Sequence, residues 1–271
     1  MTAVAYRAPS HPAMGYPCFV DPEPPDRFPR VDDQIVRPET REELVRGRTV
    51  LAMPAKEGHA DRHHTVDYLT GGCIAPGYVG SVDLLTRLGP RSDFATDTCI
   101  RREGIDPATG SRYLEELVFE IVNEQSMSDI TERAEDLSSR GVRRIIAIFV
   151  KKNEVREWSA ERNDWLVLDP AGAFEDRTLT QPIPIRALLD RTEADNAVVR
   201  ALRAKKNPEV MAVRMEGLEE GRAQTMRKAI GAFCEVLGIP FDSERRAQLE
   251  ALDSTTLDVL LDAIREQRRW P

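Results

Sequence analysis

The sequence lacks the features that mark several large classes of protein. Its four cysteines are widely separated and form no CxxC pair, which argues against a zinc knuckle and a disulfide framework. The longest aliphatic and aromatic run, "IIAIFV" at 145–150, is too short to span a bilayer, and the N-terminus has no apolar segment of a secretory signal. We therefore expect a cytoplasmic protein without a membrane anchor.

The sequence also has fewer positively than negatively charged residues. The chain has 38 Lys and Arg against 46 Asp and Glu, and its net charge of -8 argues against non-specific coating of nucleic acid. Any nucleic-acid contact should come from a local basic face. One candidate is the segment 140–162, where basic side chains outnumber three glutamates; an exposed sheet edge would explain it equally. These side chains are Arg140, Arg143, Arg144, Lys151, Lys152, Arg156 and Arg162.

Composition divides the chain into three parts. Residues 1–35 are rich in proline and predict a flexible tail. Residues 36–190 mix strand and helix patterns, and 41% apolar residues over 271 positions suffice for a hydrophobic core. Residues 191–271 are almost wholly helix-forming and predict a helical C-terminal module.

The apolar patterns of the middle part predict an α+β fold with a central mixed sheet flanked by helices. Thr40 and Glu43 have the spacing of a helix capping box, and Gly47 is placed to end that helix. A second helix over "GHADRHHTVDYL" should stop at Gly71-Gly72, and a third should run from about Ser128 to Arg140. Strands are expected over 78–89, 94–102, 115–122, 143–150, 154–160 and 164–169.

Two carboxylates on neighbouring predicted strands point to metal chemistry. Asp97 lies in "FATDTC" and Glu120 in "LVFEIV", and adjacent strands can bring both to one edge of the sheet. Mg²⁺ takes oxygen ligands and keeps waters for its substrate. A buried glutamate is costly unless it is paired or metal-bound, so Glu120 is the stronger candidate. Glu116 lies near the strand start and is expected to face solvent or to support the site.

The segment from Glu43 to Val167 resembles a known nuclease family. "EELVRGRTVLAMP", "TDTCI", "EELVFEIV" and "DITERAEDLSSRGVRRIIAIFV" are similar to successive motifs of the bacterial Uma-like restriction endonuclease family, in the PD-(D/E)XK superfamily. The resemblance implies a restriction-endonuclease-like core and hydrolysis of phosphodiester bonds in nucleic acid, with DNA the expected substrate. It implies Asp97 and Glu120 as ligands of Mg²⁺ or Mn²⁺, and it places Glu43 at the site.

One position of the resemblance departs from the family pattern. Asp129 matches an aspartate of the family's helix, but the lysine four residues later is replaced by Arg133. Arginine keeps its charge and cannot accept a proton, although it can orient a phosphate. Two hypotheses follow: a nuclease in which Arg133 assists the phosphate or the water, or an inactive nuclease-fold protein that serves binding or assembly. Without the resemblance, Asp129 and Arg133 would be an ordinary helical ion pair.

The histidines suggest a rival chemistry. His59 and His63 are four residues apart, the spacing that zinc hydrolases use on one helical face. Ala60 stands where the HExxH motif has its glutamate, and no downstream third ligand is evident. A polar surface histidine is the simpler interpretation. The resemblance also places a histidine near the site, and His63 or His64 could fill that place.

The C-terminal part predicts association. A helix should begin at Asn207-Pro208 and end at Leu237 before Gly238, followed by two short helices over 243–252 and 256–267. The first half of the long helix is charged, with only a thin apolar stripe. Such a helix tends to pair with another one, so we expect a homodimer; packing against its own domain is the alternative.

Overall fold

The computed structural model describes residues 28–52 and 54–271, and most of the tail expected over 1–35 lies outside these ranges. The last residues of that segment lie against the folded domain. Val31 is buried, and the backbone N–H groups of Ile35 and Val36 donate to the carboxylate of Asp93.

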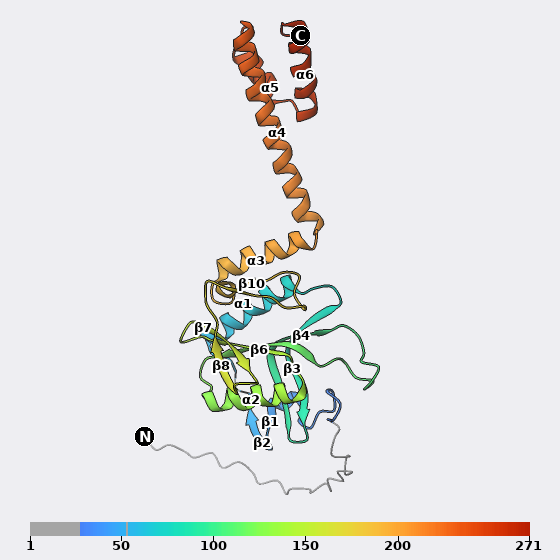
Figure 1. The fold of residues 1–271 in the computed structure, drawn as a ribbon, viewed down its shortest axis with the longest axis vertical. Coiled ribbons are helices and arrows are strands. Elements are labelled where there is room, and N and C mark those ends of the chain that lie inside the picture. Colours follow the sequence, from blue (N-terminus) through green and yellow to red (C-terminus); the bar gives the residue numbers. More distant parts are fainter. Residues whose placement is uncertain (1–27, 53) are drawn as a thin grey trace, which may run out of the picture.

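The chain forms a mixed eight-stranded sheet with helices on its faces, and a helical arm extends away from it (Figure 1). Neighbouring strands follow the order β2-β1-β4-β5-β6-β7-β8, and β3 pairs with the other edge of β4. The strands of the sheet are β1 (Glu42–Val45), β2 (Arg48–Leu51), β3 (Tyr78–Gly89), β4 (Ser92–Arg102), β5 (Glu115–Val122), β6 (Arg144–Phe149), β7 (Glu154–Ser159) and β8 (Asp164–Val167). A small separate pair is β9 (Ala173–Phe174) and β10 (Ile183–Pro184).

Six α-helices and two short 3-10 helices complete the described residues. They are η1 (Pro38–Thr40), α1 (Glu57–Cys73), α2 (Met127–Arg140), η2 (Ile185–Leu188), α3 (Arg191–Ala204), α4 (Pro208–Leu237), α5 (Ser243–Glu250) and α6 (Ser254–Gln267). The parallel pair in the sheet is β5 and β6, which α2 connects, and the other pairs are antiparallel. The expected fold class, a mixed sheet flanked by helices with a helical C-terminal module, is confirmed.

The helix predicted before Gly47 is wrong, because this segment forms the β1–β2 hairpin. Its turn is Arg46-Gly47, and both residues have positive φ, 52° and 81°. A two-residue hairpin turn with both central residues at positive φ follows the twist of the strands, and glycine adopts it without strain. The glycine that resembles a helix stop therefore makes a hairpin. Glu43 consequently lies on a strand and does not cap a helix.

Helix α1 ends at Cys73, one residue beyond the Gly71-Gly72 pair that is predicted to stop it. A Cβ atom on Gly72 would lie 2.8 Å from the methyl carbons of Val198 on α3. Gly72 thus also permits the close approach of α3 to the last turn of α1. Burial against α3 and the sheet offsets the poor helix propensity of the pair.

Two apolar layers cover the two faces of the sheet. One layer joins α1 and α3 to the sheet through residues such as Leu69, Phe119 and Ala197, and the other joins α2 through residues such as Val118 and Leu137. Alternate residues of β5 serve opposite layers, which explains why this strand is buried throughout. Helix α3 therefore packs with the sheet domain, although it begins at residue 191, where the composition predicts the start of the C-terminal module.

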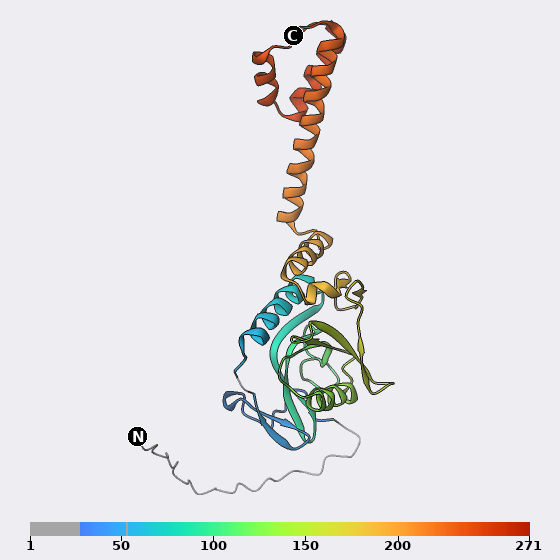
Figure 2. The same cartoon turned by 90° about the vertical axis from the view of Figure 1, so that its left-hand side faces the viewer.

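The helical arm consists of α4, α5 and α6, which share a third apolar cluster at the far end of α4 (Figure 2). Asn207 caps α4 and accepts a hydrogen bond from the N–H of Val210, and Gly238 ends the helix in the left-handed conformation. These bounds agree with the predicted helix. Among residues 28–52 and 54–271, no helix is both long and apolar enough to cross a bilayer.

Candidate functional site

The candidate site lies where the sheet splits. Strand β3 occupies one edge of β4, so β1 and β5 must share the other edge; β1 pairs there at Asp93, and β5 pairs from Thr98 onward. The backbone of β4 between these two positions has no strand partner on this edge. We call residues 94–97 the split edge. A pocket of about 1050 Å³ opens beside it and is lined by residues of β1, α1, β4, β5 and α2.

Side chains take the place of a strand at the split edge. The N–H of Ala95 donates to Glu43 Oε1 at 3.0 Å, and its carbonyl accepts from the guanidinium of Arg133. The N–H of Ile121 on β5 donates to Asp97 Oδ2 at 2.5 Å. Buried backbone groups that lack a ladder partner need such a replacement. Glu43, Arg133 and Asp97 therefore have a structural role, because they satisfy backbone groups at the split edge and on β5.

Arg133 on α2 is buried among carboxylates. Its Nη1 lies 2.8 Å from Glu43 Oε2, its Nη2 lies 3.6 Å from Glu120 Oε2, and its guanidinium stacks 4.1 Å above the ring of Phe94. The side chain is 15% exposed. The helical partner expected for it, Asp129, instead accepts a hydrogen bond from Ser126 Oγ at the start of α2, at 2.6 Å.

Asp97 and Glu120 come together through the register of two strands. Thr98 pairs with Phe119, so the next position of each strand places Asp97 beside Glu120. Two of their four carboxylate oxygens have a protein partner: Asp97 Oδ2 accepts the hydrogen bond from Ile121, and Glu120 Oε2 lies 3.6 Å from Arg133 Nη2. Glu120 Oε1 is buried without a hydrogen-bond partner, and Asp97 Oδ1 has His59 Nε2 at 3.8 Å.

The electrostatics of this pair favour protonation in the metal-free protein. Burial raises the pKa of Glu120, Arg133 opposes the rise, and the negative charges of Asp97 and Glu43 add to it, so that the pKa is about 8. Burial also raises the pKa of Asp97, against the hydrogen bond from Ile121. A bound cation would favour the ionised form of both Asp97 and Glu120.

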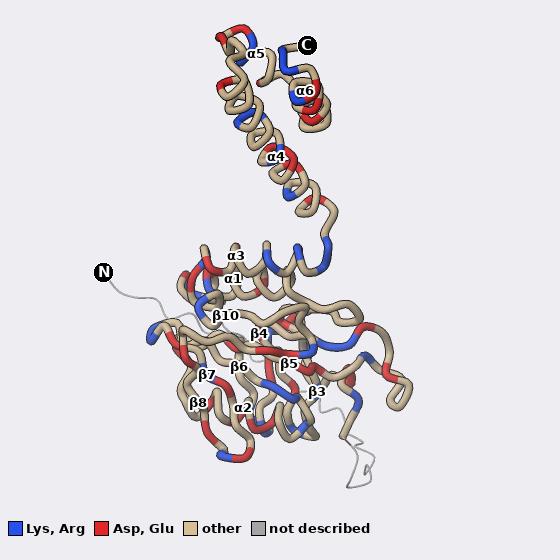
Figure 3. Tube along the Cα trace, turned by 45° about the horizontal axis from the view of Figure 1, so that its top comes forward, with Lys and Arg blue, Asp and Glu red and all other residues tan. Residues whose placement is uncertain are grey.

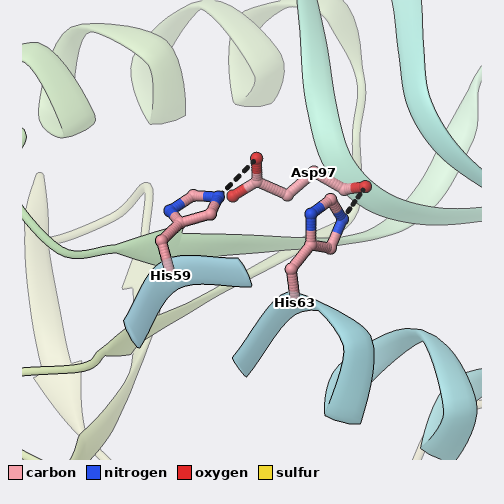
Figure 4. Close-up of side chains that lie close together, drawn as sticks. All are labelled: His59, His63 and Asp97. Atoms are coloured by element: carbon pink, nitrogen blue, oxygen red, sulfur yellow. Dashed lines mark hydrogen bonds and ion pairs between the residues drawn. The ribbon is translucent and has the colours of Figure 1, made fainter. Parts of the chain in front are cut away.

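Two histidines of α1 complete the wall of the pocket. Figure 4 shows the imidazoles of His59 and His63 turned toward Asp97. His63 Nε2 lies 2.8 Å from the backbone carbonyl of Asp97, and one ligand atom from each of the three residues lies within 4.8 Å of the others. His64, the next residue on α1, is exposed. The sequence suggested the histidine pair by its spacing and Asp97 as an acid on a strand, but nothing in the sequence indicated that these three side chains meet.

Glu116 occupies the opposite end of β5 and belongs to a different group. It accepts from Arg102 at 3.0 Å and from Arg177 at 2.6 Å, and it is 9% exposed. The expectation that it faces solvent is wrong, because arginines from the β4 end and the β9–β10 connection cover it. Its role is that of a buried ion-pair centre away from the pocket.

The basic segment 140–162 is rich in internal ion pairs. Arg144 makes a bidentate contact with Glu157, and Arg143 lies 2.7 Å from Asp176. Figure 3 shows acidic and basic segments interspersed along the chain, including this region. A polyanion that bound here would have to compete with these carboxylates.

Comparison with solved structures finds a distant similarity. No protein-family model matches the sequence, and no curated protein matches it. A solved structure from Anabaena variabilis ATCC 29413, described as "a putative nuclease belonging to DUF820", covers 58% of this chain and 92% of its own, with 12% identity and a TM-score of 0.47. This similarity is too distant to transfer an activity to the chain.

Proposed function

We propose that the chain is a metal-dependent endonuclease that hydrolyses phosphodiester bonds in nucleic acid, with DNA as its substrate. The observation that carries the proposal is the pair of carboxylates that line the same pocket: Glu120 Oε1 is buried without a hydrogen-bond partner, and Asp97 Oδ1 lies 3.8 Å from His59 Nε2. An orphaned buried carboxylate oxygen is costly, and a hard cation such as Mg²⁺ or Mn²⁺ would satisfy it. Asp97 and Glu120 are the residues that would hold this cation.

The other residues of the proposed site have separate roles. A bound divalent cation activates water and neutralises charge on a phosphate. Arg133 supplies a permanent positive charge beside Glu120 and cannot serve as a base. Glu43 positions that guanidinium through its 2.8 Å contact. The pocket beside these residues has a volume of about 1050 Å³.

The experiment is a cleavage assay on plasmid and single-stranded DNA with Mn²⁺ or Mg²⁺. We expect nicking by the wild-type chain and none by the Glu120→Ala variant, because that change removes the oxygen that the cation needs. Glu116→Gln is the matched control, since it alters the glutamate four residues earlier on β5 and should leave cleavage in place. Cleavage that is equal in wild type and Glu120→Ala would refute the proposal.

A second candidate, a non-catalytic binding or assembly protein with a nuclease-like fold, rests on the ion pairs of Arg133. Its guanidinium already compensates Glu43 and Glu120, the role that a metal would otherwise fill. Absence of cleavage by the folded wild-type chain on both substrates and with both cations would favour this candidate. The basic face over 140–162 and the cytoplasmic location remain predictions under either function.

We also propose that α4 mediates a homodimer. The first half of this helix bridges the sheet domain and the distal cluster, and residues 212–222 are all exposed (Figure 1). Among them Met215 and Leu218, which are three residues apart and therefore share one face of the helix, are each more than half exposed. A single helix that buries so little is marginal in water, and a second copy would bury its stripe.

Light scattering coupled to size-exclusion chromatography tests the dimer. We expect about twice the chain mass of 30.5 kDa for the wild type and the monomer mass for Leu218→Glu. Val199→Glu, which alters an equally exposed residue on α3, should remain dimeric. A wild-type chain that elutes as a monomer at micromolar concentration would contradict the proposal.

A further inference from the structure

We infer that His59, His63 and Asp97 form a binding site for one divalent transition-metal ion, distinct in chemistry from the oxygen site of Asp97 and Glu120. Their candidate ligand atoms all lie within 4.8 Å of one another. Ligand atoms bonded at about 2.1 Å to one ion are roughly 3 to 4 Å apart, so small side-chain rotations would close this group on an ion. The inference concerns binding and does not depend on nuclease activity.

The backbone prepares His63 for this role. Its Nε2 lies 2.8 Å from the carbonyl oxygen of Asp97, which can only accept a hydrogen bond. The proton of the neutral imidazole therefore lies on Nε2, and Nδ1 carries the free lone pair. Metal-binding histidines commonly donate their second ring N–H to a carbonyl or carboxylate in this way, which sets the tautomer and holds the ring. Asp67, at 3.6 Å from the same nitrogen, adds negative charge behind the ring.

The fold holds the three side chains at a single point. His59 and His63 project from successive turns of α1, and their ring centroids are 5.8 Å apart at an interplanar angle of 86°. Asp97 is anchored on β4 by the N–H of Ile121 and faces His59 with its other oxygen. The two imidazoles are 15% exposed, so an ion can reach them from the pocket while the protein supports them from behind.

The donor set selects the class of metal. Two imidazole nitrogens and one carboxylate suit Zn²⁺, Co²⁺, Ni²⁺, Fe²⁺ and Mn²⁺, whereas Mg²⁺ prefers oxygen ligands throughout. Asp97 belongs to both groups, so an ion held by the histidines would lie at the rim of the proposed nuclease centre. The alternative is that His59 and His63 only make hydrogen bonds and ion pairs with Asp97 and Asp67.

Co²⁺ is the probe for this site, because its visible absorption reports the ligands directly. The full chain is stripped with a chelator and titrated with Co²⁺, and Zn²⁺ and Mg²⁺ are then added in competition. We expect one equivalent of bound Co²⁺ that Zn²⁺ displaces and Mg²⁺ does not. His59→Ala and His63→Ala should each weaken binding at least about tenfold, the smallest effect typical of losing part of a metal site. His64→Ala should bind as the wild type does.

The outcomes separate this inference from the proposed function. Loss of Co²⁺ binding in both histidine variants, with circular dichroism unchanged, supports the site whether or not any variant cleaves DNA. Co²⁺ binding that is absent in the wild type, insensitive to both histidines or equally reduced in His64→Ala overturns it. Cleavage with Mn²⁺ by a protein that fails this test would leave the proposed nuclease in place without a histidine metal site.

Discussion

The Arg133→Ala variant should lose about 3 kcal/mol of unfolding free energy, the lower end of the range for breaking a buried ion pair. The change removes the cation between Glu43 and Glu120, the donor to the carbonyl of Ala95 and the group stacked on Phe94. Glu43 would lose its cationic partner, and Glu120 would lose the charge that favours its ionised form. Chemical denaturation followed by circular dichroism measures the loss.

An exposed arginine on β2, Arg48, provides the matched control for Arg133 on α2. Arg48 pairs with Glu132 on α2, but its side chain is 56% exposed. Arg48→Ala should therefore cost less than about 1 kcal/mol. In a double-mutant cycle, Arg133→Ala and Glu43→Ala together should cost clearly less than the sum of the single losses. Equal losses for Arg48→Ala and Arg133→Ala would show that the buried pair contributes no more than a surface one.

Glu120 should make the metal-free protein less stable as the pH rises. The pKa of this carboxyl is about 8 in the folded chain against an ordinary value of 4.5. Between these values the unfolded chain has lost a proton that the folded chain retains, so the unfolding free energy falls as pH increases. The contribution is complete below pH 4.5 and is lost as pH passes 8, with a slope of at most about 1.4 kcal/mol per pH unit.

Comparison with Glu120→Gln isolates this effect from all other titrating groups. The amide keeps the shape of the side chain and cannot ionise, so the stability of wild type relative to the variant should decline steadily from pH 5.5 to pH 8.5. The measurement is denaturation at each pH in the presence of a chelator. Glu116→Gln is the control, since it shows how the unfolding free energy changes when another buried glutamate of β5 loses its charge. Parallel pH curves for wild type and Glu120→Gln would contradict the shift.

Much of the fold could be predicted because its signals are local. Continuous apolar runs on β5 and β6 indicate buried strands, and the α2 segment between them has a clear cap at Ser126 and a clear stop at Gly141. Helix α4 is likewise marked by Asn207-Pro208 and Gly238. Capping and hydrophobic periodicity act within a few residues, so the sequence alone records them.

The errors arose where a local signal had a non-local cause. Gly47 is predicted to end a helix but makes the turn of a hairpin, and Gly72, one residue before the end of α1, has the further role of giving α3 room to approach. Gly47 is needed because the hairpin turn requires positive φ, and Gly72 is needed because a side chain there would collide with Val198 of α3. Propensity is a weak guide when tertiary contacts supply the larger free energy.

The sequence by itself determined which residue types were available to the site and in what local order. Asp97 and Glu120 were evident as acids on adjacent strands, and His59 and His63 as a pair on one helical face. Only the tertiary structure decided how they meet. Because β1 and β5 share one edge of β4, the sheet leaves backbone groups unpaired at 94–97, and the acids, the histidines and Arg133 converge there. That vacancy in the ladder depends on long-range strand pairing, which no short stretch of sequence specifies.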